Sequence, residues 1–285
     1  MIYTAADTPR GWIVTSKIIP ISPLHVDRDE ELRLFRSFLK DEATRHVLLI
    51  QADAGMGKSA LMEQFYSEAA AFPRALVDLR PQAFTSLEVL GELASGLETT
   101  TLDLAHAAQP LVSFFPQYTE QRAQLAEAGH TDIQHARLSD NIQTAKSPVL
   151  RAEQAARQII TDLFFHDLDA IIQNYGKVVL IIDTFEKASI DVKQWVTGLF
   201  LNRIRGRLGV IAVLAGRTIP GYWEFATTCQ LMPLELSYVQ EYVTRAELSL
   251  SEEEVRVLYD VTDGIPLYVK TYVAKLKIKR AGSRS

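Results

Sequence analysis

Short apolar runs alternate along the chain with segments whose apolar residues recur at helical spacing. Continuous apolar runs, typical of strands buried on both faces of a parallel sheet, cover His46–Gln51, Ala75–Leu79, Val178–Asp183 and Gly209–Ala215. A weaker run near Cys229–Met232 is stopped by the following proline. Because helical patterns separate these runs, the sequence predicts an α/β fold with an open, mainly parallel sheet.

The helices between the strands are predicted from apolar stripes and from residues that favour helix ends. The first is expected to begin at Asp27, which has capping-box spacing to Glu30. The others are expected at Lys58–Ala71, at Leu87–Leu97, at 156–176 and at 192–204.

The same patterns divide the chain into three parts. Residues 1–25 contain four proline or glycine breakers and are predicted to be an arm or linker. Residues 26–236 form the α/β domain, with a weakly patterned helical insert at about 82–150. Residues 237–285 are predicted to form a small helical lobe that is incomplete at its end.

Capping residues also divide the helical lobe. Ser237 with Gln240, and Ser251 with Glu254, have the spacing of capping boxes at the starts of two helices. A third helix is expected from Pro266 to Lys279.

Composition restricts the class of protein. The chain has 285 residues, 47% of them apolar, which excludes a disordered or fibrous protein. Its net charge of −5 does not favour nucleic acid as a partner. The longest apolar runs are far shorter than the roughly 20 residues of a membrane-spanning helix, and no signal-peptide core precedes them. With a single cysteine, Cys229, the chain is expected to be cytoplasmic, with no membrane partner.

The stretch Gln51–Ala60 (Q-A-D-A-G-M-G-K-S-A) carries the chemistry. Its two glycines allow a tight turn whose N–H groups form a nest for phosphate oxygens, at the start of a helix. Lys58 supplies a charge for the β- and γ-phosphates, and the Ser59 hydroxyl is a ligand for Mg²⁺. Ala52 stands where the full P-loop pattern has glycine. The expected nucleotide-binding residues of this loop are Ala54, Gly55, Met56, Gly57, Lys58, Ser59 and Ala60.

A second strand supports the same interpretation. Val178–Asp183 ends in a carboxylate where a Walker-B aspartate belongs, so Asp183 is expected to hold Mg²⁺ opposite Ser59. A glycine turn and a strand-ending aspartate are each common alone. Together and in this order they predict a nucleotide site in a P-loop NTPase three-layer sandwich.

The sequence resembles the STAND class of P-loop NTPases. These are AAA+-related signalling ATPases that include the NB-ARC and NACHT proteins. Four segments match that pattern in order over roughly residues 25–275. They are His25–Leu32 for the family's V-G-R-E-x-E-L, with Asp27 in place of glycine; Asp183–Glu186 for the extended Walker-B; Val213–Arg217 for the strand with a sensor arginine; and Gly264–Leu267 for the G-x-P signature.

The resemblance implies roles for further residues. Val26 and Arg28 would lie near the adenine and ribose, Pro266 would pack near the base, and Arg217 would report on the γ-phosphate. Relatives continue into a winged helix and repeats, so we expect either a fragment of a longer protein or a minimal relative.

The position after the Walker-B aspartate departs from many related ATPases. In those ATPases a glutamate at this position orients the attacking water. Here the position is Thr184, and the next acidic residue is Glu186. Glu186 is therefore the candidate base, and hydrolysis is expected to be slow.

We expect an ATP-binding, slowly hydrolysing signalling switch that uses ATP, ADP and Mg²⁺. Its nucleotide state would control self-association, as a homo-oligomer, or release of a protein partner. The alternatives are a DNA-associated AAA+ ATPase similar to origin-recognition proteins, a small-metabolite P-loop kinase, and a scaffold that binds nucleotide without hydrolysing it.

Overall fold

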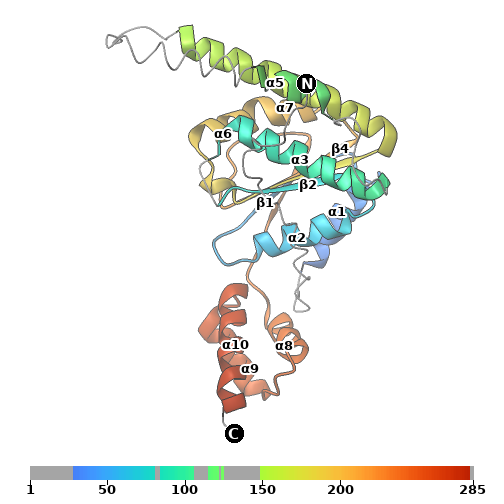
Figure 1. Ribbon diagram of the computed structural model, residues 1–285. Helices are drawn as coiled ribbons and strands as arrows, with labels where there is room; N and C mark the ends of the chain where they lie inside the picture. Colours follow the sequence, from blue (N-terminus) through green and yellow to red (C-terminus); the bar gives the residue numbers. More distant parts are fainter. Residues whose placement is uncertain (1–27, 81–83, 106–114, 122, 125–147, 283–285) are drawn as a thin grey trace, which may run out of the picture.

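A computed structural model describes residues 28–80, 84–105, 115–121, 123–124 and 148–282 of the chain, with the backbone alone at 148–153 and 281–282. Five parallel strands form one sheet in the order β2-β3-β4-β1-β5 (Figure 1). They are β1 (Val47–Gln51), β2 (Arg74–Asp78), β3 (Val178–Asp183), β4 (Val210–Gly216) and β5 (Ala226–Gln230). The predicted parallel α/β sheet is therefore confirmed.

Helices cover both faces of this sheet, so the domain has three layers. Side chains that alternate along each strand point to opposite faces. Val47 and Leu49 of β1 join a hydrophobic cluster with α3 (Ser86–Ala105) and α5 (Pro148–Tyr175). Leu48 and Ile50 join a second cluster, formed with α1 (Asp29–Leu39) and α2 (Lys58–Glu68).

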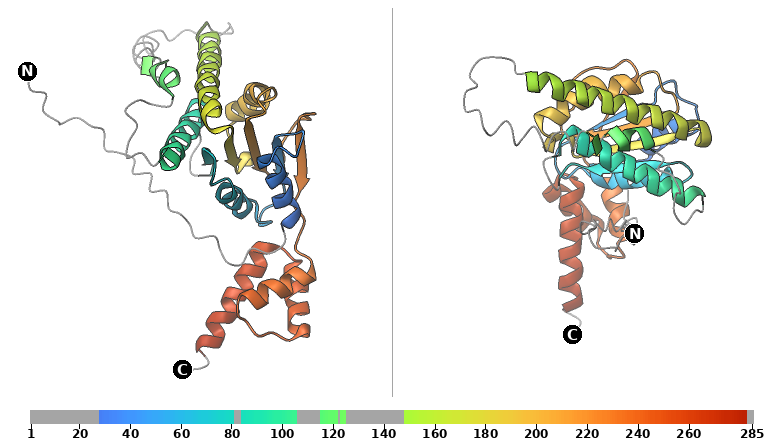
Figure 2. Two further views of the ribbon diagram at one scale, coloured as in Figure 1. Left: turned by 90° about the vertical axis from the view of Figure 1, so that its right-hand side faces the viewer. Right: turned by 45° about the horizontal axis from the view of Figure 1, so that its top comes forward.

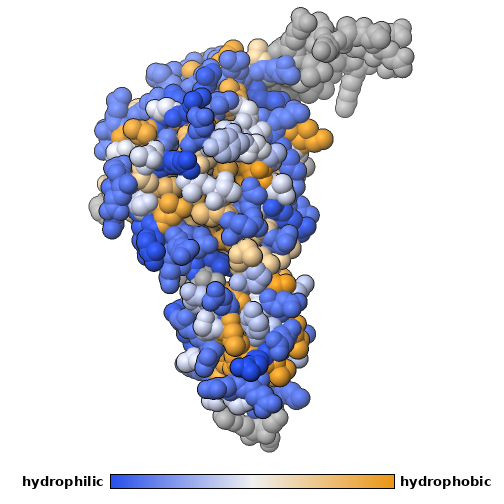
Figure 3. Space-filling view, turned by 180° about the vertical axis from the view of Figure 1, so that it is seen from behind, coloured by the Kyte–Doolittle hydropathy of each residue, from blue (hydrophilic) through white to orange (hydrophobic). Residues whose placement is uncertain are grey.

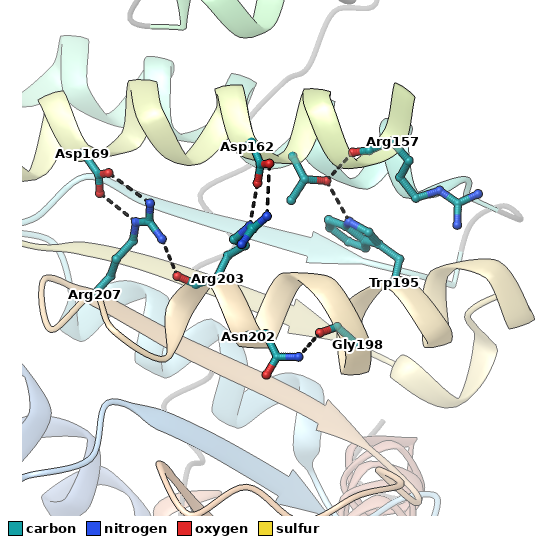
Figure 4. Close-up of polar contacts among 9 residues, drawn as sticks. Arg157, Asp162, Asp169, Trp195, Gly198, Asn202, Arg203 and Arg207 are labelled. Carbon is teal, nitrogen blue, oxygen red and sulfur yellow. Dashed lines mark hydrogen bonds and ion pairs between the residues drawn. The ribbon is translucent and has the colours of Figure 1, made fainter. Parts of the chain in front are cut away.

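The outer helix α5 is tied to the segment between β3 and β4 (Figures 1 and 2). That segment contains a 3₁₀ turn η1 (Phe185–Lys187), α6 (Ile190–Trp195), a π-helical stretch η2 (Val196–Phe200) and α7 (Leu201–Ile204). Trp195 Nε1 donates to Thr161 Oγ1 over 3.1 Å, and Arg203 and Arg207 pair with Asp162 and Asp169 (Figure 4). These contacts hold α5 against α6, α7 and the turn that follows α7.

A separate hydrophobic cluster lies in the helical lobe, which contains α8 (Leu236–Arg245), α9 (Glu252–Thr262) and α10 (Pro266–Gly282). Among the described residues, its buried members all come from positions 234–273. In Figure 2 the lobe projects from the α/β domain. Figure 3 shows hydrophobic patches within its otherwise mostly hydrophilic surface. None of the helices in the described ranges is long and apolar enough to span a membrane.

One of the predicted capping boxes is correct and one is wrong. The Ser251 hydroxyl accepts the N–H of Glu254, whose carboxylate accepts the N–H of Ser251, as predicted. Ser237 instead lies inside α8, whose N-cap residue is Glu235 without a side-chain bond. The helix starts early because Leu236, its first residue, packs against the lobe's cluster. The predicted first cap, Asp27, lies outside the described residues.

Candidate functional site

The glycine loop joins β1 to α2 at the carboxyl end of the sheet. Gly55 and Gly57 have φ of +87° and +86°, a conformation that favours glycine. Gly57 is also the N-cap residue of α2, and no side chain caps the helix. The first N–H groups of α2 therefore have neither an intrahelical acceptor nor a side-chain cap, an arrangement that suits a bound anion.

Lys58 is the first residue of α2, directly after the loop, and 9% of its surface is exposed. Its ammonium group donates to the carbonyls of Ala52 at 2.6 Å and Asp53 at 2.8 Å. Burial lowers the pKa of Lys58, while the nearby carboxylates of Glu186 and Asp183 oppose that shift. A desolvated ammonium of this kind gains most from an anion that enters beside it.

The structure brings Asp183 and Ser59 together. Asp183 ends β3 and is 2% exposed, and it accepts the Thr184 N–H at 2.7 Å. Burial raises the pKa of Asp183, and a hydrogen bond from the Ser59 side chain opposes the rise. A carboxylate and a hydroxyl at one point are hard oxygen donors of the kind that Mg²⁺ prefers. The residues present therefore fit this metal.

Thr184 occupies a strained position directly after Asp183. Its φ of +61° is unusual for a β-branched residue and costs about 1–3 kcal/mol. Its N–H is held by Asp183 and its hydroxyl by Asp78, so the surrounding groups fix this conformation. The strain marks the turn that leads into Glu186.

Glu186 and Arg217 come from different elements and meet at the cleft. Glu186 lies in η1, and Arg217 directly follows β4. The Glu186 carboxylate accepts the Arg217 N–H at 3.2 Å, and its other oxygen lies 3.6 Å from Arg217 Nε. Because β4 lies between β1 and β3, both residues reach the end of the sheet that carries the loop.

The sequence interpretation missed Asp78 and Arg80 at the end of β2. Asp78 is in register with Asp183 on the neighbouring strand. Burial raises the pKa of Asp78, but hydrogen bonds from Arg80 and Thr184 outweigh it and leave the pKa below its usual value. The signal was available, since the carboxyl ends of parallel strands share one edge of a sheet and Asp78 precedes a strand-stopping Arg-Pro pair.

The helical lobe closes one side of the loop. The Leu267 N–H donates to the Gly55 carbonyl at 3.1 Å, one residue after Pro266. A Cβ at Gly55 would lie 3.2 Å from the side chains of Ile265 and Leu267, so glycine also allows this approach. Arg28 bridges the same region, because its Nη2 donates to the carbonyls of Met56 and Met232, each at 3.1 Å.

These elements enclose a cleft of about 460 Å³. All the predicted loop residues from Ala54 to Ala60 line it, together with Glu186, Arg217 and Pro266. Asp183 lies beneath it against Ser59, and Val26 lies outside the described residues. The basic residues lining the cleft are Arg28, Lys58, Arg80, Lys187, Arg217 and Lys270. This positive lining fits a polyphosphate.

A parallel sheet with a glycine loop between β1 and α2, and an aspartate at the end of β3, defines the fold of a P-loop NTPase. Comparison with solved structures finds the same fold. A Walker-type ATPase of Pyrococcus abyssi is 17% identical with a TM-score of 0.52, over 88% of this chain and 67% of the other. A STAND protein with a tetratricopeptide repeat sensor from Pyrococcus horikoshii is 20% identical with a TM-score of 0.50, over 86% of this chain.

This chain spans 29% of the length of that STAND protein. No family model matches the sequence, and no curated protein matches it either. The likeness therefore establishes the fold of this chain, and the functional conclusions rest on the residues of the cleft.

Proposed function

We propose that this chain binds Mg-ATP and hydrolyses it slowly, as a nucleotide-dependent switch of the STAND class. The observation that carries the proposal is the meeting of three groups in one cleft. These are the uncapped start of α2, the buried ammonium of Lys58, and the contact between Ser59 and Asp183. The order of the four STAND-like segments along the sequence supports the choice of class.

Each group has a part in this proposal. The N–H groups at the start of α2 and Lys58 bind the phosphates. Bound Mg²⁺, held by Ser59 and Asp183, would supply charge neutralisation at the β- and γ-phosphates. Glu186 accepts a proton from the attacking water, and Arg217 binds the γ-phosphate. Arg28 and Pro266 lie at the part of the cleft nearest the helical lobe and bind the nucleoside.

The switch follows from contacts between the two parts of the chain. Leu267 of the helical lobe bonds to Gly55 inside the loop, and Pro266 and Lys270 of the lobe also line the cleft. A nucleotide in the cleft therefore contacts both the glycine loop and the helical lobe. ATP and ADP can then favour different arrangements of the lobe, with self-association or partner release as the output.

Nucleotide binding and solution mass test this proposal. Nucleotide released from the purified protein is identified, affinities for ATP, ADP and GTP are measured by calorimetry, and mass is measured with and without Mg-ATP. We expect bound ADP or ATP, and a mass that changes with Mg-ATP. K58A should lose nucleotide binding and keep its circular dichroism spectrum. Unchanged affinity in K58A would overturn the site, and an unchanged mass would argue against self-association.

A second candidate is a scaffold that binds nucleotide without hydrolysing it. The observation that favours it is Thr184 at the position directly after Asp183, with its hydroxyl engaged by Asp78. Single-turnover hydrolysis separates the two functions, since the scaffold retains radiolabelled ATP unchanged.

A further inference from the structure

An acidic and a basic residue that the sequence pattern did not single out stand at the end of β2, beside the metal side of the cleft. Asp78 is paired in register with Asp183, and its carboxylate raises the pKa of that residue. Arg80 lines the cleft together with Ser59 and Thr184. A cation therefore lies on the side where Ser59 and Asp183 meet.

Asp78 holds one edge of the Arg80 guanidinium. Arg80 Nε lies 2.7 Å and 3.0 Å from the two carboxylate oxygens, and Nη2 lies 2.7 Å from Oδ2. The Arg80 backbone N–H also donates to Asp78, at 3.0 Å. Within the described part of the chain, Nη1 has no hydrogen-bond partner. A planar fork fixed along one edge keeps its remaining donors in a set orientation.

We propose that Arg80 binds the terminal phosphate of the nucleoside triphosphate and that Asp78 is the residue that positions it. This inference rests on the proposed function. The phosphate is the terminal one because Arg80 follows β2, which pairs with β3 beside Asp183, whereas the helical lobe follows β5 at the opposite edge of the sheet. Lys58 and Arg217 also bind the phosphates in the proposed function. The contact of Arg80 is made with ATP and not with ADP, because ADP lacks the terminal phosphate.

The chain contains a matched pair away from the cleft. Arg36 donates to both oxygens of Glu68, at 2.9 Å and 2.6 Å. The two arginines are similarly exposed, 46% for Arg36 and 57% for Arg80. Arg36 is not among the residues that line the cleft. An effect of R80A that R36A does not share therefore comes from the location at the cleft.

Calorimetric affinities for a non-hydrolysable ATP analogue and for ADP, both with Mg²⁺, test the role of Arg80. R80A should bind the ATP analogue about tenfold or more weakly, the effect of losing a hydrogen bond to a charged group. Its ADP affinity should change less than about threefold, and R36A should match the wild type for both ligands. An ATP-analogue affinity of R80A close to wild type, or equal losses for both ligands, would overturn the inference. Failure of the wild type to bind either ligand would instead contradict the proposed function itself.

The role of Asp78 is tested by a variant for which charge and positioning predict opposite results. Removing a negative charge beside the phosphates in D78N would by itself tighten binding of the ATP analogue. Loss of positioning would instead weaken binding of the ATP analogue. We expect D78N to bind the analogue about fivefold more weakly, with little change in its affinity for ADP. In the R80A background, D78N should cause no further loss, which a double-mutant cycle measures. Tighter binding by D78N, or additive losses, would contradict the positioning role.

Discussion

Glu186 and Arg217 form a pair across the carboxyl ends of β3 and β4, with the Arg217 N–H 3.2 Å from one carboxylate oxygen and Nε 3.6 Å from the other. The two residues were predicted separately, one as the base and one as the γ-phosphate sensor. Their contact means that the position of either residue depends on the other.

The base assignment predicts the effect of E186Q. A glutamine keeps the side-chain size and still accepts the Arg217 N–H, but it cannot take a proton from water. Single-turnover hydrolysis should slow by about 10²-fold or more, with ATP affinity unchanged. An unchanged single-turnover rate in E186Q would show that Glu186 is not the base.

The buried Asp183, which the proposed function uses to hold Mg²⁺, is expected to lower the stability of the folded protein near neutral pH. Because burial raises its pKa, the folded protein binds a proton at this site more tightly than the unfolded chain does. The favourable contribution of protonated Asp183 is therefore present at low pH and is lost as the pH rises through the folded-state pKa. D183N should raise the free energy of unfolding by about 1 kcal/mol near neutral pH.

That gain should shrink as the pH is lowered toward the ordinary pKa of an aspartate. Urea unfolding at several pH values, in the presence of a metal chelator and without nucleotide, measures it. D103N, at an exposed position of α3, is the control and should show no such pH-dependent gain. If D183N were less stable than the wild type near neutral pH, the predicted increase in the free energy of unfolding would be wrong.

A side chain at position 264 is expected to affect both the stability of the helical lobe and nucleotide binding at the glycine loop. Gly264 has φ of +66°, and a Cβ there would lie 2.2 Å from the Leu234 carbonyl oxygen. G264A should lower the free energy of unfolding by about 2 kcal/mol or more and weaken nucleotide binding, because Leu267 would shift from Gly55. G206A is the control, since a Cβ at Gly206 would meet nothing within 4 Å. Wild-type stability in G264A would disprove this constraint.

The two serines with capping-box spacing predict different results in the helical lobe. S251A should destabilise the lobe by about 1 kcal/mol, because Ser251 caps α9. S237A should change the stability by less than about 0.5 kcal/mol, because Ser237 is an exposed residue inside α8. Chemical unfolding followed by circular dichroism compares the two, and equal losses would contradict the assigned caps.

Local pattern was sufficient for most elements. β3 was predicted with its observed bounds, Val178–Asp183. Its short apolar run follows a helix-ending glycine and ends in an aspartate, a pattern typical of a buried strand in an α/β chain. The helix ends were less accurate. α5 begins at Pro148, well before the predicted 156, because its start lies in the weakly patterned insert. Sequence spacing also could not distinguish Ser237 from Ser251, since α8 begins where the partly buried Leu236 packs against the cluster of the lobe.

The sequence by itself determined the glycine loop, Lys58, Ser59 and the strand-ending Asp183, because a tight turn between a strand and a helix is a local structure. Tertiary structure alone decided which distant groups meet them. Strand order brought Asp78 and Arg80 beside Asp183, and Glu186 to Arg217. It also placed Leu267 against Gly55, although the two residues are 212 positions apart in the sequence. These contacts depend on which strands are neighbours and on how the lobe packs, and spacing along the chain encodes neither.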